Sequence, residues 1–319
     1  MPTPRRRVLA ALARGLVGVA AVVFVAYHLS WREVWAALRR ARVELLVVVV
    51  AINGLMLTIR AARLQVLLSP ARASLASLFR AVLTSSAINN VFPLRAGDVA
   101  RLYMLESCAG IGKSTAMAIA VVEKLLEVVV LAALALGATC FAPAQPWVLG
   151  TGAAALGVAV AALVILRRLA DGGSGRIPGF LRAAAARIAP GMTVLRSSEA
   201  MAETLGASLA AWSCEIAMII LCARAIGLHV APVLAVVVLL GINLAMAVPA
   251  LPANAGTFES AAAVVLVFAK VGKPTAVAFA LLYHLVQVVP VTLAGLGVLA
   301  RSGFRLRPPE APGVTTSAG

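Results

Sequence analysis

Charged residues are what this sequence has least of. They make up only 13% of the chain, whereas 62% of the residues are hydrophobic and the mean hydropathy is +1.00. These values lie far outside the range of soluble globular domains. The composition therefore predicts a polytopic membrane protein, in which spans of about 20 apolar residues form helices and strands are not expected.

Cysteine and histidine are scarce as well. No CxxC pattern occurs and no histidine stands near a cysteine at ligand spacing, so we expect neither a disulfide nor a metal site and infer no cofactor. No nucleophile is accompanied by a base that could orient it, and the sequence therefore predicts no catalytic residue and no enzyme. Of the three histidines, only His284 lies beside other polar residues of an apolar segment, where it could relay protons.

Acidic residues are outnumbered by basic ones, 12 against 28, which gives a formal net charge of +16. Such an excess is also typical of nucleic-acid-binding proteins, but here the arginines cluster beside apolar spans. Membrane orientation explains that distribution better, and attraction of anionic lipid remains a weaker second interpretation. The basic clusters at residues 5–7, 167–187 and 301–307 predict that both termini and the loop at 171–198 are cytoplasmic.

The apolar segments predict an all-α fold with about six full spans and two re-entrant helical hairpins. The spans are expected at residues 8–29, 43–68, 114–140, 147–166, 202–226 and 274–300. Residues 1–300 then form one membrane domain, with repeat one at 43–140, a linker at 167–201 and repeat two at 202–300. The tail at 301–319 is rich in Pro, Gly, Ser and Thr, so we expect it to be disordered.

The two hairpins are predicted from matching breaks in the apolar pattern. Residues 74–110 are interrupted at Pro93 and Gly97, and residues 233–271 at Pro252 and Gly256. The segment that returns from the first break carries Arg95, Asp98, Arg101 and Glu106, and such charge is costly in a lipid-exposed crossing but tolerated in a hairpin that protein shields. The second hairpin is expected as a copy of the first.

An internal duplication links these hairpins. Residues 112–120 align without a gap on residues 272–280, and six of the nine positions are identical. Because the first hairpin is expected to enter from the cytoplasmic side and the second from outside, the two units have opposite orientation. This is the inverted repeat of many transporters, whose sites lie where broken helices meet.

Polar residues occur at equivalent places in the last helix of each repeat. In repeat one they are Glu123, Lys124 and Glu127; in repeat two they are Tyr283, His284 and Gln287. Ionisable groups at such depth face a cavity or a partner. The alternative is that Glu123 or Glu127 pairs with an arginine only to fix helix packing, and the two roles do not exclude each other.

Arginines near the breaks are the candidate phosphate ligands, since a broken helix adds NH groups and a positive dipole end. We expect Arg60 and Arg95 to bind phosphate, and Arg63 to extend its side chain to the membrane interface. The acidic residues nearby are expected to hold those arginines or to contact a cationic headgroup. They are Asp98, Glu123 and Glu259, and Asn254 is a further candidate for substrate binding at the second break. Asp98 is equally well explained as a helix N-cap.

An amphipathic segment at residues 31–42 precedes the second span. Its apolar face is expected to hold Trp31, Val34, Trp35 and Leu38, the spacing of an interfacial helix. Because one span separates it from the cytoplasmic N-terminus, this segment should lie on the outer side of the membrane. Its four arginines conflict with that position, since basic residues favour the cytoplasmic side.

Three motifs together resemble the lysylphosphatidylglycerol synthase transmembrane-region family, whose members are also called flippase-like domain proteins. The motifs lie at residues 89–101, 122–127 and 251–259, and the resemblance covers residues 8–300. It implies a lipid translocator; Lys124 stands where the family commonly has Arg, and Glu127 where Asp is usual. The soluble aminoacyl-transferase domain of bifunctional members has no counterpart in this sequence, so synthase activity is not implied.

We therefore expect an inner-membrane flippase that moves an anionic or aminoacylated phospholipid, a hopanoid or a glycolipid, with no nucleic-acid partner. Its oligomeric state is left open. A second hypothesis is a non-transporting accessory subunit that positions a lipid-modifying enzyme. A third, a membrane-embedded transferase acting on a polyprenyl-linked sugar, is disfavoured because the loop at 171–198 is basic where a metal-dependent site requires acids.

Overall fold

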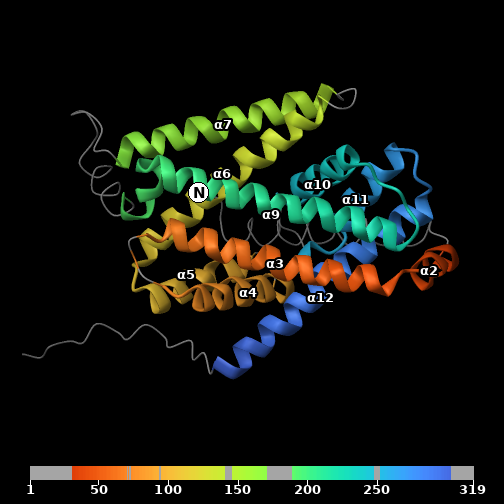
Figure 1. Cartoon of the computed structure of the whole chain (residues 1–319), viewed down its shortest axis with the longest axis horizontal. Helices are drawn as coiled ribbons and strands as arrows, with labels where there is room; N and C mark the ends of the chain where they lie inside the picture. Colours follow the sequence, from red (N-terminus) through yellow and green to blue (C-terminus); the bar gives the residue numbers. More distant parts are fainter. Residues whose placement is uncertain are drawn as a thin grey trace, which may run out of the picture.

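The computed structural model describes residues 31–69, 71, 73–92, 95–140, 146–170, 189–247 and 252–302. Within these residues the regular structure is entirely helical, which confirms the expected all-α fold (Figure 1). The α-helices are α2 (Trp31–Arg39), α3 (Val43–Leu67), α4 (Leu75–Val91), α5 (Ala96–Ala109), α6 (Lys113–Ala138), α7 (Pro146–Ala170), α9 (Ser198–Ala225), α10 (Pro232–Met246), α11 (Thr257–Phe268) and α12 (Lys273–Ser302). Two short 3-10 helices are η1 (Ala189–Arg196) and η2 (Pro252–Asn254).

Four of these helices are long and apolar enough to cross a membrane, namely α3, α7, α9 and α12. Helix α6 has 26 residues, which at about 1.5 Å per residue exceeds a hydrocarbon core of roughly 30 Å. Glu123, Lys124 and Glu127 interrupt its otherwise apolar sequence near the middle. These five helices match five of the expected spans. The span expected at 8–29, the loop at 171–188 and the tail from 303 lie outside the described residues.

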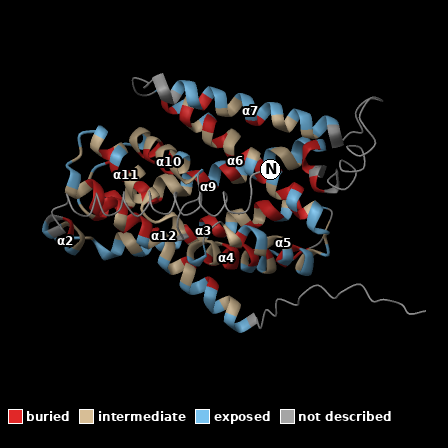
Figure 2. Ribbon diagram, turned by 180° about the vertical axis from the view of Figure 1, so that it is seen from behind, coloured by how far each residue is buried: buried red, intermediate tan, exposed pale blue. Residues whose placement is uncertain are grey.

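Exposed residues occur along the helices on the outside of the molecule (Figure 2), and many of them are large and apolar. Val158, Phe268 and Leu293 are 70%, 82% and 68% exposed. Contiguous apolar surface is unfavourable in water but natural against lipid tails. The exposed surface therefore agrees with a protein whose helices are surrounded by a bilayer.

The first hairpin consists of α4 and α5, and its tip lies at residues 92–95. Arg95 adopts the left-handed conformation, with φ 55° and ψ 43°, immediately before α5. Gly97 was expected at the break, but it lies within the first turn of α5. Its role is close packing, because a Cβ there would overlap the Ser85 carbonyl oxygen of α4. Pro93 lies outside the described residues.

The second hairpin consists of α10 and α11, joined through η2. Helix α10 already ends at Met246, and the expected breaks at Pro252 and Gly256 fall in the connection. Three residues there have positive φ: Ala253, Asn254 and Gly256. Left-handed backbone costs about 1–2 kcal/mol at a residue other than glycine, so tertiary contacts must hold this tip in place.

The first helices of the two predicted repeats, α3 and α9, pack against each other. The backbone NH of Arg42, at the start of α3, donates to the carbonyl of Ala225, at the end of α9. Near the other end of α3, Arg63 donates to Ser208 of α9. Helices α3 and α9 therefore lie side by side and run in opposite directions, as an inverted repeat requires (Figure 1). The repeats also exchange contacts, since α12 packs on α4 and α6 packs on α10.

Helix α2 precedes α3 and packs against α12. Val34 is buried and Leu38 is half-buried, whereas Trp35 is 57% exposed. Trp35 thus lies on a part of α2 that protein does not cover. Its indole lies under the guanidinium of Arg39, at 5.4 Å, a cation–π contact that stabilises an exposed aromatic ring.

Candidate functional site

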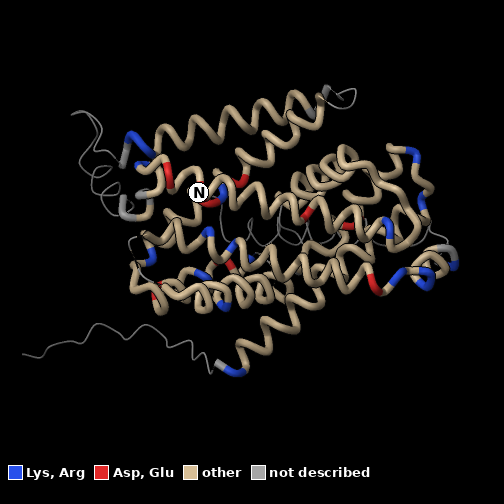
Figure 3. The backbone as a smooth tube through the Cα atoms, viewed as in Figure 1, with Lys and Arg blue, Asp and Glu red and all other residues tan. Residues whose placement is uncertain are grey.

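Charged residues occur along the middle of the helices as well as at their ends (Figure 3). The most buried of them is Arg63 of α3, whose side chain is 1% exposed. It lies 2.6 Å from Glu123 Oε1 and 2.6 Å from Glu127 Oε1 of α6. The expectation that Arg63 extends to the membrane interface is therefore wrong. Two carboxylates one helical turn apart on α6 form a receptor for the guanidinium, and together they offset its desolvation.

Two further cations complete this cluster. Arg101 of α5 lies 2.7 Å from Glu123 Oε2, and Lys124 lies 2.7 Å from Glu127 Oε2. Arg101 is 17% exposed and Lys124 is 62% exposed. The arginine pair that was considered as a purely structural alternative for Glu123 and Glu127 is thus present. The cluster contains three cations, Arg63, Arg101 and Lys124, and two carboxylates, so positive charge exceeds negative charge by one.

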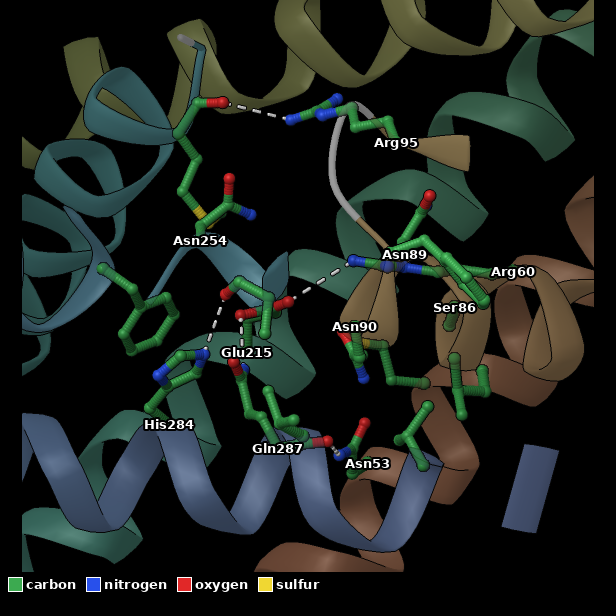
Figure 4. A pocket seen from close by; sticks show the side chains of 18 residues that line it. Asn53, Arg60, Ser86, Asn89, Asn90, Arg95, Glu215, Asn254, His284 and Gln287 are labelled. Atoms are coloured by element: carbon green, nitrogen blue, oxygen red, sulfur yellow. Dashed lines mark hydrogen bonds and ion pairs between the residues drawn. The ribbon is translucent and has the colours of Figure 1, made fainter. Parts of the chain in front are cut away.

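A second polar cluster is centred on Glu215 of α9. Its Oε1 lies 3.3 Å from Arg60, while its Oε2 accepts hydrogen bonds from Tyr283 at 3.0 Å and from Gln287 at 3.2 Å. Gln287 also donates to the Tyr283 hydroxyl. Helices α3, α9 and α12, drawn from both repeats, are thereby joined by one acid (Figure 4).

The two hairpin tips meet directly. Arg95 of the first hairpin donates from its guanidinium to the carbonyl of Met246, at the end of α10, at 3.1 Å. No carboxylate of the described residues lies within ion-pair distance of Arg95. The cation that the sequence places at the first break is therefore anchored by one neutral bond and retains its charge for another partner.

Each tip is also fixed internally. In the first hairpin, Asn89 accepts from the NH of Gly97 at 2.7 Å and donates to Asp98 at 3.0 Å. In the second, Glu259 accepts from the NH of Gly256 at 2.7 Å and contacts His284 Nδ1 at 2.7 Å.

Several pairings expected from the sequence are therefore wrong. Glu123 binds Arg63 and Arg101 in place of Arg60 or Arg95, and Asp98 and Glu259 bind Asn89 and His284 in place of an arginine. Asp98 is also not an N-cap, because Arg95 occupies the N-cap position of α5. The backbone NH of Gly97, in the first turn of α5, donates instead to the side chain of Asn89.

These groups surround two adjoining cavities of about 260 Å³ and 550 Å³. The cavities share Arg60, Asn89, Arg95, Glu215 and Gln287, so polar groups from both repeats converge on one space. In Figure 4, Arg60 points toward Glu215 across the cavity, and Arg95 and Asn254 lie on the side away from α12.

Of the residues singled out in the sequence, seven line this space: Arg60, Arg95, Asp98, Glu123, Lys124, Glu127 and Asn254. Glu259 lies just behind it, on His284.

Sequence reasoning missed three charged residues of this arrangement. Arg63 was assigned to the interface, and neither Arg101 nor Glu215 was predicted to be a site residue. For Glu215 a signal was present in the sequence: it is an acid within a long apolar helix, and an ionisable group in such a helix indicates a partner inside the protein. Which helix supplied the partner was not readable from the sequence.

The chain was also compared with known proteins. A search of curated proteins finds no match. The model of the family described as the lysylphosphatidylglycerol synthase TM region matches residues 11–295, which is most of the chain. That family is one of membrane proteins linked to lipid handling, in agreement with the buried polar cavity and the apolar exterior. The chain therefore belongs to the lysylphosphatidylglycerol synthase TM region family.

Proposed function

We propose that this protein moves an anionic phospholipid or a related amphiphile between the leaflets of a membrane, with the headgroup passing through the cavity at the hairpin tips. The observation that carries the proposal is the meeting of both repeats at this cavity, where Arg95 of one tip reaches Met246 of the other. In inverted-repeat transporters the site lies where broken helices of the two halves meet. No catalytic role is assigned to any residue of the cavity.

Arg95 favours an anion in the cavity. The charged side chains that line the two cavities balance, four basic against four acidic: Arg60, Arg95, Arg101 and Lys124, and Asp98, Glu123, Glu127 and Glu215. Arg95 differs from the other three cations because no carboxylate of the described residues lies within ion-pair distance of it. A charge without a partner inside a membrane protein is costly. A phosphate at Arg95 would pair with that charge and accept the forked hydrogen bonds that a guanidinium offers.

Two buried donors add to this support. Among the described residues, Arg60 Nε and Trp212 Nε1 are enclosed N–H groups without a hydrogen-bond partner, and both side chains line the larger cavity. Buried polar groups are almost always bonded in native proteins, so such exceptions need an explanation. Because both N–H groups are enclosed in this conformation, headgroup oxygen atoms would satisfy them once the side chains turn toward the cavity.

An apolar chamber of about 370 Å³ continues from the polar cavity between α6, α7 and α10. Arg95, Lys124 and Trp212 line both spaces, whereas most of the remaining lining is aliphatic, for example Leu131, Ala135 and Leu244. A polar chamber with an apolar extension matches the shape of an amphiphile. We assign the headgroup to the first and part of an acyl chain to the second.

We place the protein in the inner membrane with both termini cytoplasmic. The support is the basic residues at two helix ends, Arg167 and Arg168 of α7 and Arg301 of α12. A fluorescent protein fused to the C-terminus should fluoresce, because that reporter folds on the cytoplasmic side. If that fusion is dark and a C-terminal fusion to a phosphatase that is active only outside the cytoplasm shows activity, the C-terminus is outside and the assigned orientation is wrong.

The test of translocation uses the full chain in liposomes that contain headgroup-labelled lipid, anionic in one set and zwitterionic in the other. A membrane-impermeant quencher measures how fast inner-leaflet label becomes accessible. We expect faster exchange of the anionic lipid than in empty liposomes, and a loss of roughly tenfold or more in Arg95→Ala, since a hydrogen bond to a charged group contributes about 1.5–3 kcal/mol.

Arg301→Ala is the matched control, because Arg301 is exposed at the end of α12 and lines none of these cavities. It should exchange lipid at the wild-type rate. If the wild type equals empty liposomes for every lipid, translocation is excluded and the accessory-subunit hypothesis takes its place; co-purification of a lipid-modifying enzyme would then be sought.

A further inference from the structure

The imidazole of His284 lies between two hydrogen-bond acceptors. Its Nδ1 is 2.7 Å from Glu259 Oε1 of α11, and its Nε2 is 3.0 Å from the backbone carbonyl of Ala253 in η2. The other carboxylate oxygen of Glu259 already accepts the NH of Gly256. The histidine is 8% exposed and stacks on Phe258 at 4.4 Å between ring centroids, so the ring is held on its face as well as at both nitrogens.

This geometry fixes the number of protons. A neutral imidazole carries one N–H and one lone pair, and a carbonyl oxygen can only accept. Both contacts are hydrogen bonds only if one additional proton is present, either on His284 as imidazolium or on Glu259 as a carboxylic acid. Without that proton, a nitrogen lone pair of His284 faces an oxygen atom at hydrogen-bond distance, in a site where unsatisfied polar groups are expensive.

The same contacts hold the tip of the second hairpin against α12. Ala253 and Asn254 have φ of 52° and 55°, a backbone conformation that is strained for residues with a side chain. The bond from His284 is to the carbonyl of Ala253 itself, and the bond from Glu259 holds the NH of Gly256, two residues after Asn254. Removing the proton breaks one of the His284 bonds and leaves the strained tip with fewer contacts to hold it.

The remaining charged groups near His284 come from several helices. Arg60 of α3, Glu215 of α9 and Arg95 of the first hairpin line the cavity that His284 also lines, and Tyr283 lies beside it on Glu215. Helix α10 carries no charged residue, Glu259 is the charged residue of α11, and Arg80 of α4 is exposed. The charged residues with described side chains on α2 are Arg32 and Arg39, both exposed.

We propose that Glu259 and His284 form a proton-binding site, and that the proton is the coupling ion of the translocation proposed above. While the proton is bound, the second hairpin is latched to α12; when it leaves, the tip is released and the cavity between the two hairpins can rearrange. The coupling of this proton to lipid movement rests on the proposed function, whereas the proton-binding site does not depend on it.

The proton is observed directly in the full chain, reconstituted in lipid nanodiscs with ¹⁵N-labelled histidine. Solid-state NMR distinguishes doubly from singly protonated rings, and infrared difference spectra detect a protonated carboxyl. We expect a doubly protonated His284, or a carboxylic acid band from Glu259, that disappears as pH rises. If His284 is singly protonated and Glu259 ionised at every pH at which the protein is folded, the proposal is overturned.

Glu259→Gln is the decisive variant, because its amide completes the network without the extra proton. The amide NH can donate to Nδ1 of a neutral imidazole, the amide oxygen can accept from Gly256, and Nε2–H still reaches Ala253. Hydrogen exchange of residues 252–259, corrected for the intrinsic pH effect, should rise with pH in the wild type and stay constant in Glu259→Gln. His229→Gln, at an exposed histidine after α9, should behave as wild type. Equal pH profiles in the wild type and Glu259→Gln would exclude the latch.

Liposomes with a transmembrane pH difference test the coupling. With one proton per lipid, the steady-state distribution of labelled lipid should change by up to about tenfold per pH unit in the wild type, and not at all in Glu259→Gln. Lipid that equilibrates without responding to the gradient overturns coupling but leaves translocation standing. Absence of any lipid movement overturns translocation, and the spectroscopic result then still decides the proton site.

Discussion

Helices α6 and α12 occupy equivalent places in the two repeats, yet their polar side chains differ in kind. In repeat one, Glu123 and Glu127 bind the guanidinium of Arg63, which stays charged at any pH at which the protein is folded. In repeat two, the equivalent residues Tyr283 and Gln287 are neutral and bind Glu215 through ordinary hydrogen bonds.

The position between the two polar residues differs in the same way. Lys124 is largely exposed and paired with Glu127, whereas His284 is enclosed and shares a proton site with Glu259. The difference teaches that one half of the inverted repeat is locked by permanent charges, while the other is held by bonds that a single proton can change. An asymmetry of this kind lets one hairpin move against a fixed one.

Breaking the charge cluster of repeat one should have the largest effect. Arg63→Met leaves Glu123 and Glu127 enclosed without their shared cation, and breaking a buried pair in this way costs about 3–5 kcal/mol. We expect a much lower melting temperature in detergent or no folded protein. Arg63→Met with Glu127→Gln should recover part of the loss, because it removes the repulsion between two carboxylates that Arg63 no longer separates, while Glu123 keeps Arg101 and the mostly exposed Lys124 is screened by water. A single variant as stable as the wild type would show that the cluster is not structural.

The two hairpins can be compared through their glycines. Gly97→Ala places a Cβ on the Ser85 carbonyl and should force α4 and α5 apart at a cost of about 1–3 kcal/mol. Gly256→Ala has a different cause, the φ of 83°, and should cost about 1–2 kcal/mol. Thermal unfolding measures both. Gly157→Ala, which meets no neighbouring atom in α7, is the control and should be neutral or slightly stabilising; similar losses in all three variants would refute the steric account of Gly97.

The smallest effect is expected in the Glu215 cluster. In Glu215→Gln, the amide oxygen still accepts from Tyr283, and Arg60 is partly exposed at 28% of its side chain, so water screens its unpaired charge. We expect a loss of about 1 kcal/mol or less in stability, well below that of Arg63→Met. A loss as large as that of Arg63→Met would mean that both repeats are held by charge, which contradicts the asymmetry.

Much of the architecture was readable because its signals are local. Apolar runs of span length predicted α3, α6, α7, α9 and α12, and the shared Gly-Lys-x-Thr pattern at 112 and 272 predicted the duplication. Interruptions of an apolar run predicted that two segments form hairpins. Whether a helix crosses a membrane depends on its own composition, and composition needs no tertiary contact to be read.

The partners of the charged residues were not readable in this way. Arg60 and Arg63 are one turn apart on α3, and the sequence favoured the first as the deep residue; the structure buries the second, because both carboxylates of α6 converge on it. Likewise, Glu259 could pair with any cation near a break, and only the packing of α11 on α12 brings it to His284.

The sequence by itself determined the class, the helices, the duplication and the list of polar residues that must avoid lipid. Only the tertiary structure decided which of those residues meet, because an ion pair or a shared proton depends on distances between helices that are far apart in the chain. The cost of an unpaired charge in a membrane guarantees that a partner exists. Its identity is set by which helix faces lie opposite each other once the two repeats have packed.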